Sequence, residues 1–272
     1  RDVKTTDPVA IGDHVHFLDA GDGTGRIVEV LPRINKLSRR AAGRKPLEQT
    51  LVANVDQLIA VIPAADPKTP KWALLDRYLA SAEAQDVPAV ICLTKLDLND
   101  TDELREQLAV YERAGYPAVP TSIVTGEGID TLRELVAGKF SVLIGKSGVG
   151  KTSLLNALQP GLGKAVREIN RKSGKGKHTT SHVEVHELDF GGALVDTPGI
   201  REFGLWNVHM DDVALLFPEF RAYLGGCQFT SDCSHTHEPG CAVKAALARG
   251  EIDSNRYESY DKLWHELARS SD

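Results

Sequence analysis

The chain has 272 residues, of which 42% are apolar and 26% charged, and its formal net charge is −6. This composition is typical of a globular protein and excludes wholesale disorder and collagen-like repetition. No apolar run approaches the ~20 residues that a membrane span requires, and the first residues lack the basic-then-apolar pattern of a secretory signal, so we expect a soluble, cytoplasmic protein without a membrane partner.

The N-terminal part of the chain alternates short apolar runs with Gly and Asp turns. Val15–Leu18, Arg26–Leu31 and Thr50–Ala53 have the length and composition of strands, and Ala20–Gly25 is rich in turn residues. We therefore predict a small all-β module, a barrel, over residues 1–52.

From Asp56 onward, strand patterns alternate with helical patterns. Such alternation predicts a mostly parallel sheet covered by helices on both faces, and we assign this α/β domain to residues 53–205. The expected strands are Gln57–Ile62, Ala89–Thr94, Ala118–Thr121, Phe140–Ile144, Val183–Leu188 and Ala193–Asp196, and the expected helices are Pro70–Gln85, Asp100–Ala114, Ile129–Ala137 and Lys151–Leu158.

The last part of the chain, residues 206–272, is predicted to be helical around a cysteine cluster. Helical patterns cover His209–Pro218, Ala242–Arg249 and Ser254–Ser270. A chain without an export signal keeps its thiols reduced, so clustered cysteines indicate a metal site before a disulfide. Zn²⁺ takes four N or S ligands, which three thiolates and one imidazole can supply as a structural site. The candidate ligands are Cys227, Cys233 and Cys241 with either His235 or His237.

A phosphate-binding loop follows the predicted strand Phe140–Ile144. Residues 145–152 read G-K-S-G-V-G-K-T and fit the pattern G-x-x-x-x-G-K-[ST], with a predicted helix directly after them. The glycines let backbone N–H groups turn toward phosphate oxygens, Lys151 reaches the β- and γ-phosphates, and Thr152 binds Mg²⁺. The nucleotide residues predicted here are Gly145, Gly148, Val149, Gly150, Lys151, Thr152 and Ser153.

A second phosphate-side motif closes the predicted strand Ala193–Asp196. Residues 196–199 read D-T-P-G. The carboxylate of Asp196 can hold Mg²⁺ through water, and the N–H of Gly199 can face the γ-phosphate. A D-x-x-G turn is common by itself, but one at a strand end after a P-loop indicates a nucleotide site.

A base-reading motif, T-K-L-D at residues 94–97, follows the predicted strand Ala89–Thr94. Asp97 can accept two hydrogen bonds from guanine N1 and N2, which adenine cannot supply, and the stem of Lys95 can lie over the base. By itself the motif fits a helix entry equally well, with Asp97 as a turn residue. A backbone N–H near Ile123 would reach guanine O6. The residues predicted for the base side are Thr94, Lys95, Asp97, Ser122 and Ile123.

The order of these motifs and the placement of basic residues narrow the function further. In ordinary GTPases the P-loop comes first and the base-reading motifs come last, whereas here the order is cyclically changed, which is feasible where termini lie close together.

Two basic islands, Arg26–Lys45 and Lys164–His178, stand in an otherwise acidic chain. Either island alone fits a solvated loop, but together they favour a polyanionic partner such as nucleic acid.

Together these motifs resemble the RsgA (YjeQ) family of circularly permuted GTPases that depend on the small ribosomal subunit. The resemblance covers nearly the whole chain. It rests on I-G-D-H-V at 11–15, G-R-I at 25–27, Arg33, Arg39, A-N-V-D-Q at 53–57, S-G-V-G-K at 147–151, H-T-T at 178–180, D-T-P-G at 196–199 and E-P-G-C at 238–241.

The resemblance implies an N-terminal OB-fold, a permuted GTPase domain and a C-terminal zinc domain. It also implies GTP hydrolysis stimulated by the small subunit during its late assembly, a bound rRNA partner and a monomeric protein that binds GTP and GDP. The family pattern selects His235 as the fourth zinc ligand. The chain departs from the pattern in carrying Thr94 where most GTPases have Asn, Thr152 in place of the commoner Ser, and five residues in place of four between Cys227 and Cys233.

The segment between the P-loop and D-T-P-G is expected to contain a switch loop. A threonine there can bind Mg²⁺ and close over the γ-phosphate, and we favour Thr180 over Thr179. Ile200 occupies the position after D-x-x-G where small GTPases carry a water-orienting Gln, and its side chain cannot orient water. The family suggests His178 as the catalytic group, which can position or deprotonate water near neutral pH; the alternative is a histidine that contacts phosphate or RNA.

Three other functions are compatible with parts of the sequence. An ATP-using P-loop enzyme is disfavoured by Asp97. An RNA-binding module that uses GTP only as a structural ligand is conceivable because of Ile200. A permuted GTPase of large-subunit assembly is disfavoured by the β module and zinc cluster, through the resemblance alone.

Overall fold

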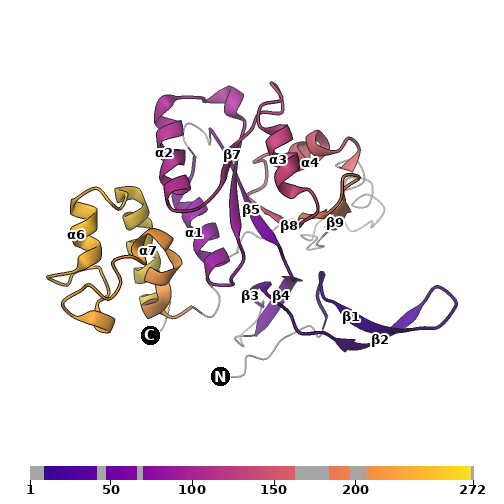
Figure 1. Cartoon of the computed structure of the whole chain (residues 1–272), viewed down its shortest axis with the longest axis horizontal. Helices are drawn as coiled ribbons and strands as arrows, with labels where there is room; N and C mark the ends of the chain where they lie inside the picture. The colour runs from indigo at the N-terminus through magenta and orange to yellow at the C-terminus, as the bar shows by residue number, and fades with distance from the viewer. Residues whose placement is uncertain are drawn as a thin grey trace.

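A computed structural model of the chain describes residues 9–41, 47–65, 70–162, 184–196, 205 and 208–270. An N-terminal β module, a central sheet with helices and a C-terminal helical module follow one another along the chain (Figure 1). The predicted order of all-β start, α/β centre and helical end with a cysteine cluster is confirmed. Among the described helices, none combines the length and the apolar character needed to cross a membrane.

The N-terminal module consists of two antiparallel strand pairs in its described residues. β1 (Val15–Asp19) and β2 (Gly25–Val30) form a hairpin that extends away from the rest of the molecule (Figure 1). β3 (Lys36–Arg40) pairs with β4 (Glu48–Ala53). The sequence K-L-S-R-R does not predict β3, because it carries a single strongly apolar residue; pairing with β4 and the burial of Leu37 form this strand.

An ion pair holds the start of this module together. Arg33 Nε and Nη2 donate to the two carboxylate oxygens of Asp13 at 2.6 and 2.8 Å, and Nη1 donates to Thr50 Oγ1 at 3.3 Å. The side chain of Asp13 is 1% exposed. The hydrogen bond from Arg33 lowers the pKa of Asp13 against the opposing effect of burial. Arg33 belongs to the first basic island, but its ion pair with Asp13 neutralises its charge within the module.

Replacing Arg33 by Met is expected to destabilise the chain in a pH-dependent way. The substitution leaves a buried carboxylate without its cation and should lower the free energy of unfolding at pH 7 by about 3 kcal/mol. Because the pKa of Asp13 is below 3.8 in the folded chain, the pair stabilises above that pH, and its contribution is lost as pH falls through the folded pKa. Urea unfolding at stepwise lower pH measures this. Arg26→Met, at an exposed position of β2, is the control, and a penalty for Arg33→Met that stays constant into acid would contradict the assignment.

The central sheet has six strands in the order β7-β6-β5-β8-β10-β9. All neighbouring pairs are parallel except β10 and β9, which are antiparallel. The two strands β5 and β6 are buried along their whole length, as expected for a parallel sheet covered on both faces. The bounds are β5 (Gln57–Pro63), β6 (Ala89–Thr94), β7 (Ala118–Pro120), β8 (Phe140–Ile144), β9 (Glu184–Glu187) and β10 (Ala193–Asp196).

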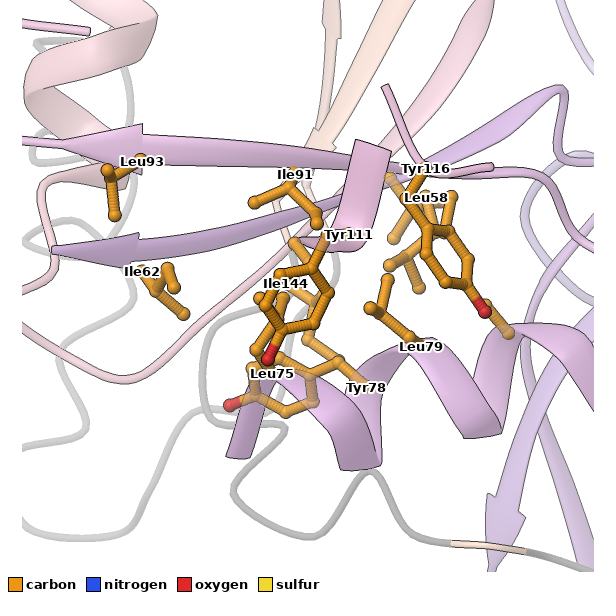
Figure 2. Packing of buried hydrophobic residues seen from close by; sticks show 14 of the residues in the cluster. Leu58, Ile62, Leu75, Tyr78, Leu79, Ile91, Leu93, Tyr111, Tyr116 and Ile144 are labelled. Atoms are coloured by element: carbon orange, nitrogen blue, oxygen red, sulfur yellow. The ribbon is translucent and has the colours of Figure 1, made fainter. Parts of the chain in front are cut away.

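Alternate residues of β5 serve the two faces of the sheet. Leu58 and Ile62 join the core under α1 (Trp72–Glu83) and α2 (Asp102–Arg113), and Figure 2 shows them in one cluster with Leu75, Ile91 and Tyr111. Ile59 and Val61 join the core under α3 (Ile129–Val136) and α4 (Lys151–Leu158). The predicted helices are therefore confirmed to within a few residues, and they cover both faces.

The strand order brings the predicted motifs to one edge of the sheet. From β5 the chain continues outward to β6 and β7, whereas from β8 it continues in the opposite direction, to β9 and β10. Open α/β sheets bind ligands at the carboxyl ends of strands where the order reverses in this way. The carboxyl ends of β8, β6 and β10 carry the P-loop, the T-K-L-D motif and Asp196 respectively.

A network of backbone and side-chain bonds joins the N-terminal module to the sheet. Asn54, at φ 52°, donates from Nδ2 to Gly12 O at 2.9 Å. Gly12 lies so close to the backbone of Ala53 that an added Cβ would be 2.1 Å from the Ala53 carbonyl oxygen. Asp56 accepts from the N–H of Phe140 at 2.7 Å, at the first residue of β8. The A-N-V-D-Q motif thus fixes the module directly to the strand that leads into the P-loop.

The C-terminal module packs several short helices and the longer α7 (Ser254–Ser270) around an aromatic core. Phe217, Phe220 and Tyr260 are buried together with Ala80 of α1, so this core is continuous with the α/β domain. The predicted helix His209–Pro218 is a 3-10 helix rather than an α-helix. The elements are η2 (Met210–Leu216), η3 (Pro218–Phe220), η4 (Thr230–Asp232), α6 (Ala242–Ala248) and α7 (Ser254–Ser270).

Candidate nucleotide site and metal centre

The P-loop backbone requires its glycines. A Cβ on Gly145 would lie 2.5 Å from Val61 O of the neighbouring strand β5. Gly148 and Gly150 have φ values of 84° and 111°, which side chains disfavour. Gly150 directly precedes α4, so the N–H groups of the first turn of that helix face the loop. This strand–loop–helix arrangement is suited to binding phosphate.

Lys151 lies at the first position of α4 and turns back over the loop. Its Nζ donates to Gly145 O at 2.6 Å and to Lys146 O at 3.3 Å. Burial lowers the pKa of Lys151, and the negative charge of Asp196 partly opposes this shift. Asp196 itself is buried at the end of β10. The predicted phosphate lysine and the predicted Mg²⁺-side carboxylate are therefore electrostatic neighbours.

The base-reading loop is bonded to the P-loop. Thr94 is buried, and its Oγ1 donates to Val149 O at 2.6 Å. Lys95, at φ 60°, donates from Nζ to Gly148 O at 2.9 Å. Sequence reasoning assigned both residues to the nucleotide and missed these contacts, because the two segments lie about 50 residues apart and no pattern in either one reports the other.

The two predicted base-side loops also contact each other. Ser122 Oγ donates to Asp97 Oδ1 at 2.6 Å and accepts from the N–H groups of Val124 and Thr125 at 3.2 Å each. Asp97 is exposed while Ser122 is buried. The serine hydroxyl therefore holds one oxygen of the Asp97 carboxylate. Ile123 is exposed next to this pair.

Several predicted residues lie outside the part of the chain that the structure describes. These are His178, Thr179, Thr180, Gly199 and Ile200. Of the remaining P-loop residues, Thr152 is half-buried and Ser153 exposed, both in the first turn of α4.

The cysteine cluster forms a compact donor set. The ligand atoms of Cys227, Cys233, His235 and Cys241 all lie within 4.8 Å of one another, and all four residues are buried. The Sγ atoms of Cys227 and Cys241 are 3.9 Å apart, far beyond the ~2.05 Å of a disulfide. Burial raises the pKa of Cys233 to about 12, and a bound cation would favour the thiolate form of this side chain. The group fits a four-coordinate metal ion.

The structure distinguishes the two candidate histidines. His235 Nδ1 lies 3.4 Å from the Sγ atoms of both Cys227 and Cys241. His237 is exposed, and its Nδ1 contacts Thr236 Oγ1 at 2.9 Å instead. His235 therefore belongs to the donor set, as predicted, and adopts a φ of 57° to do so.

Hydrogen bonds around the cluster hold its ligands in place. The N–H groups of Ala242 and Lys244 donate to the Sγ atoms of Cys227 and Cys241 at 3.3 and 3.5 Å. Such outer contacts orient metal ligands and tune their charge.

Glu238 closes the loop that carries His235. Burial opposes its ionisation, but the hydroxyl and N–H of Ser234 bind its carboxylate and lower the pKa of Glu238 to about 2.

Comparisons with known proteins agree with this arrangement. The family model described as "RsgA GTPase" matches residues 30–206. The small ribosomal subunit biogenesis GTPases RsgA of Gemmatimonas aurantiaca and Bacteroides fragilis are 45% and 38% identical over 95% and 96% of this chain, and each is covered over 84% of its own length.

Solved structures show the same likeness. The crystal structure of YjeQ from Thermotoga maritima matches with a TM-score of 0.77 and 37% identity, over 96% of this chain and 84% of that one. The structure of YloQ, described as a circularly permuted GTPase, matches with a TM-score of 0.75 and 30% identity, over 98% and 83%. With its motif order, sheet topology and buried Cys₃His group, the chain belongs to the RsgA GTPase family.

Proposed function

We propose that the chain hydrolyses GTP and acts in biogenesis of the small ribosomal subunit. One observation carries the nucleotide assignment: Thr94 and Lys95 bond to the carbonyls of Val149 and Gly148, so the guanine-selecting loop and the phosphate loop form a single site. The relatives named above, which are small-subunit biogenesis GTPases, support the subunit assignment. We divide the chain into an OB-fold module (1–52), a permuted GTPase domain (53–205) and a zinc domain (206–272).

The hydrolytic roles follow from the chemistry of each residue. Lys151 and the P-loop N–H groups stabilise the charge that develops on the phosphate oxygens. Thr152 and Thr180 are the residues that would hold Mg²⁺, which neutralises phosphate charge when bound. The carboxylate of Asp196 would hold this ion through water, and the N–H of Gly199 would contact the γ-phosphate. His178 positions or deprotonates the attacking water.

The Cys₃His group is proposed to hold one structural Zn²⁺. Three thiols and one imidazole suit this ion, and with all four positions taken by protein no open position remains for chemistry. The ligands would be the thiolates of Cys227, Cys233 and Cys241 and the neutral imidazole of His235.

Ribosomal RNA is proposed as the polyanionic partner of a monomeric, cytoplasmic protein. Part of the first basic island is neutralised internally, since Lys36 pairs with Glu48 at 2.7 Å and Arg33 pairs with Asp13. Arg26 on β2 is exposed and available to phosphates. Its role in docking is therefore expected to exceed that of Arg33.

Hydrolysis assays test the proposal. GTP turnover is measured with the protein alone, with purified small subunits and with large subunits, and ATP serves as the control nucleotide. Stimulation by small subunits alone supports the proposal. Stimulation by large subunits alone favours the other assembly branch, GTP binding without stimulation favours the non-enzymatic module, and displacement of GTP by equal ATP contradicts guanine selection.

Replacing Asp97 by Asn is expected to change which base is bound. The amide presents a donor where the carboxylate presents an acceptor, so it cannot satisfy both guanine N–H groups, whereas xanthine offers an oxygen at position 2. We expect GTP affinity to fall by about 10²-fold and xanthosine triphosphate to bind more tightly than GTP. Competition binding measures both. Asp100→Asn, exposed and paired with Arg105 nearby, is the matched control, and equal losses for both nucleotides would contradict base reading by Asp97.

A further inference from the structure

The seam between the C-terminal module and the α/β domain contains a buried cation. Arg256 of α7 is 1% exposed and is the largest fully buried side chain in the described part of the chain. Arginine is almost never buried to this extent unless it is paired. Neither the nucleotide site nor the metal site uses this residue, so its burial calls for a separate explanation.

Arg256 contacts both sides of the seam at once. Its Nη1 donates to Asp76 of α1 at 2.7 Å. Its Nε and Nη2 donate to Glu219 of η3 at 2.6 and 3.0 Å. Its guanidinium carbon also lies 5.3 Å from the ring centre of Tyr111 in α2 and 4.7 Å from that of Phe217. One side chain thus ties the C-terminal module to two helices of the α/β domain.

The same turn of α7 holds the loop of the metal site. Tyr257, the next residue, donates from its hydroxyl to His235 O at 2.7 Å. Tyr260, one turn after Arg256, donates to Ser234 O. A metal ligand and its neighbour are therefore bonded to the helical turn that carries the seam cation.

The contacts of Arg256 leave few partly docked arrangements of α7 on α1. A buried guanidinium between two carboxylates is tolerated only while its donors stay aligned, since a small shift leaves charges buried and unpaired. Docking of α7 on α1 is thus expected to be all-or-none. Outside this cluster, the exposed pairs Arg221–Glu83 and Arg77–Glu266 also cross the seam but face solvent and contribute little.

We propose that the turn of α7 from Arg256 to Tyr260 couples metal binding at the Cys₃His group to docking of the C-terminal module on α1. With the metal bound, the loop at residues 234–235 fixes Tyr257 and Tyr260, which hold α7 where Arg256 meets Asp76. Release of the metal frees the loop, and the seam opens as a unit. The α/β core does not depend on this contact and stays folded.

Hydrogen exchange of the backbone amides tests the coupling in the full-length, metal-loaded chain. Treatment of the wild type with a chelator is expected to speed exchange of the α1 amides by about 10-fold while β5 and β8 keep their protection. Arg256→Met should show faster α1 exchange before chelation. Lys262→Met, which breaks an exposed pair with Glu258 on the same helix, should leave α1 unchanged.

A second variant separates coupling from simple loss of stability. Tyr257→Phe combined with Tyr260→Phe keeps both rings in the core but removes the two hydroxyl contacts to the metal loop. In this variant the chelator effect on α1 should shrink to about 2-fold. The proposal is overturned if chelation leaves α1 of the wild type protected, or if α1 of the double variant responds to chelation as strongly as the wild type.

Discussion

Replacing Lys151 by Met is expected to lower kcat/KM for subunit-stimulated GTP hydrolysis by about 10²–10³-fold. The ammonium of Lys151 lies 2.6 Å from Gly145 O, within the loop that would surround the phosphates. Its charge stabilises the transition state more than the ground state, so the loss falls largely on the chemical step. Single-turnover hydrolysis with saturating small subunits measures the effect.

Lys146→Met is the matched control for this experiment. Lys146 belongs to the same loop and its substitution removes the same charge, but its side chain is exposed, and Lys151 contacts only its backbone carbonyl. We expect a less than about 3-fold effect from this change. Equal losses in the two variants would mean that loop charge in general, rather than the placed ammonium, carries catalysis.

Replacing Cys241 by Ser is expected to abolish tight metal binding and to destabilise the C-terminal module. A serine hydroxyl does not ionise near neutral pH, so one of four ligands is lost, and the free energy of binding a structural Zn²⁺, on the order of 10 kcal/mol, is also free energy of folding. Cys241 additionally caps α6 by accepting from the N–H of Lys244. Serine is a favourable N-cap residue, so the cap survives and the metal ligand alone is removed.

Metal content by elemental analysis and the thermal unfolding profile measure this result. Cys92→Ala is the control, because Cys92 is a buried core thiol of β6 and no part of the donor set. It should keep one metal per chain and lose stability by cavity formation only. A Cys241→Ser protein with full metal content and a wild-type unfolding profile would refute the assignment of Cys241 as a ligand.

The sequence predicted those elements whose pattern is local. The apolar runs of β5 and β6 and the glycine spacing of the P-loop report their structures directly, and the cysteine spacing anticipated the buried donor set. β3 escaped prediction because its burial arises from distant partners: the N–H of Ser38 donates to Gln85, which follows the end of α1.

The parts of the site that the sequence could not predict involve pairs of residues far apart in the chain. Thr94 was assigned to the base, yet its hydroxyl binds the P-loop, a contact that exists only because β6 and β8 flank β5. The choice between His235 and His237 depended on the family resemblance, because the spacing of the cysteines is compatible with either histidine as a ligand. The burial of Arg256 likewise could not be predicted from the sequence, because the residues next to it in the chain do not indicate its partners in α1 and η3.

The strand order has a consequence for folding of the chain during its synthesis. The first strands of the central sheet to be synthesised are β5, β6 and β7, which can pair as one half of it. Every later strand adds outward from β5: β8 lies next to β5, then β10, with β9 outermost. No strand has to be inserted between two that are already paired. The nascent half-sheet nevertheless presents the fully buried strand β5 as an open, apolar edge until residues 140–144 leave the exit tunnel. A pause in translation just before Phe140 would therefore prolong exposure of an aggregation-prone edge.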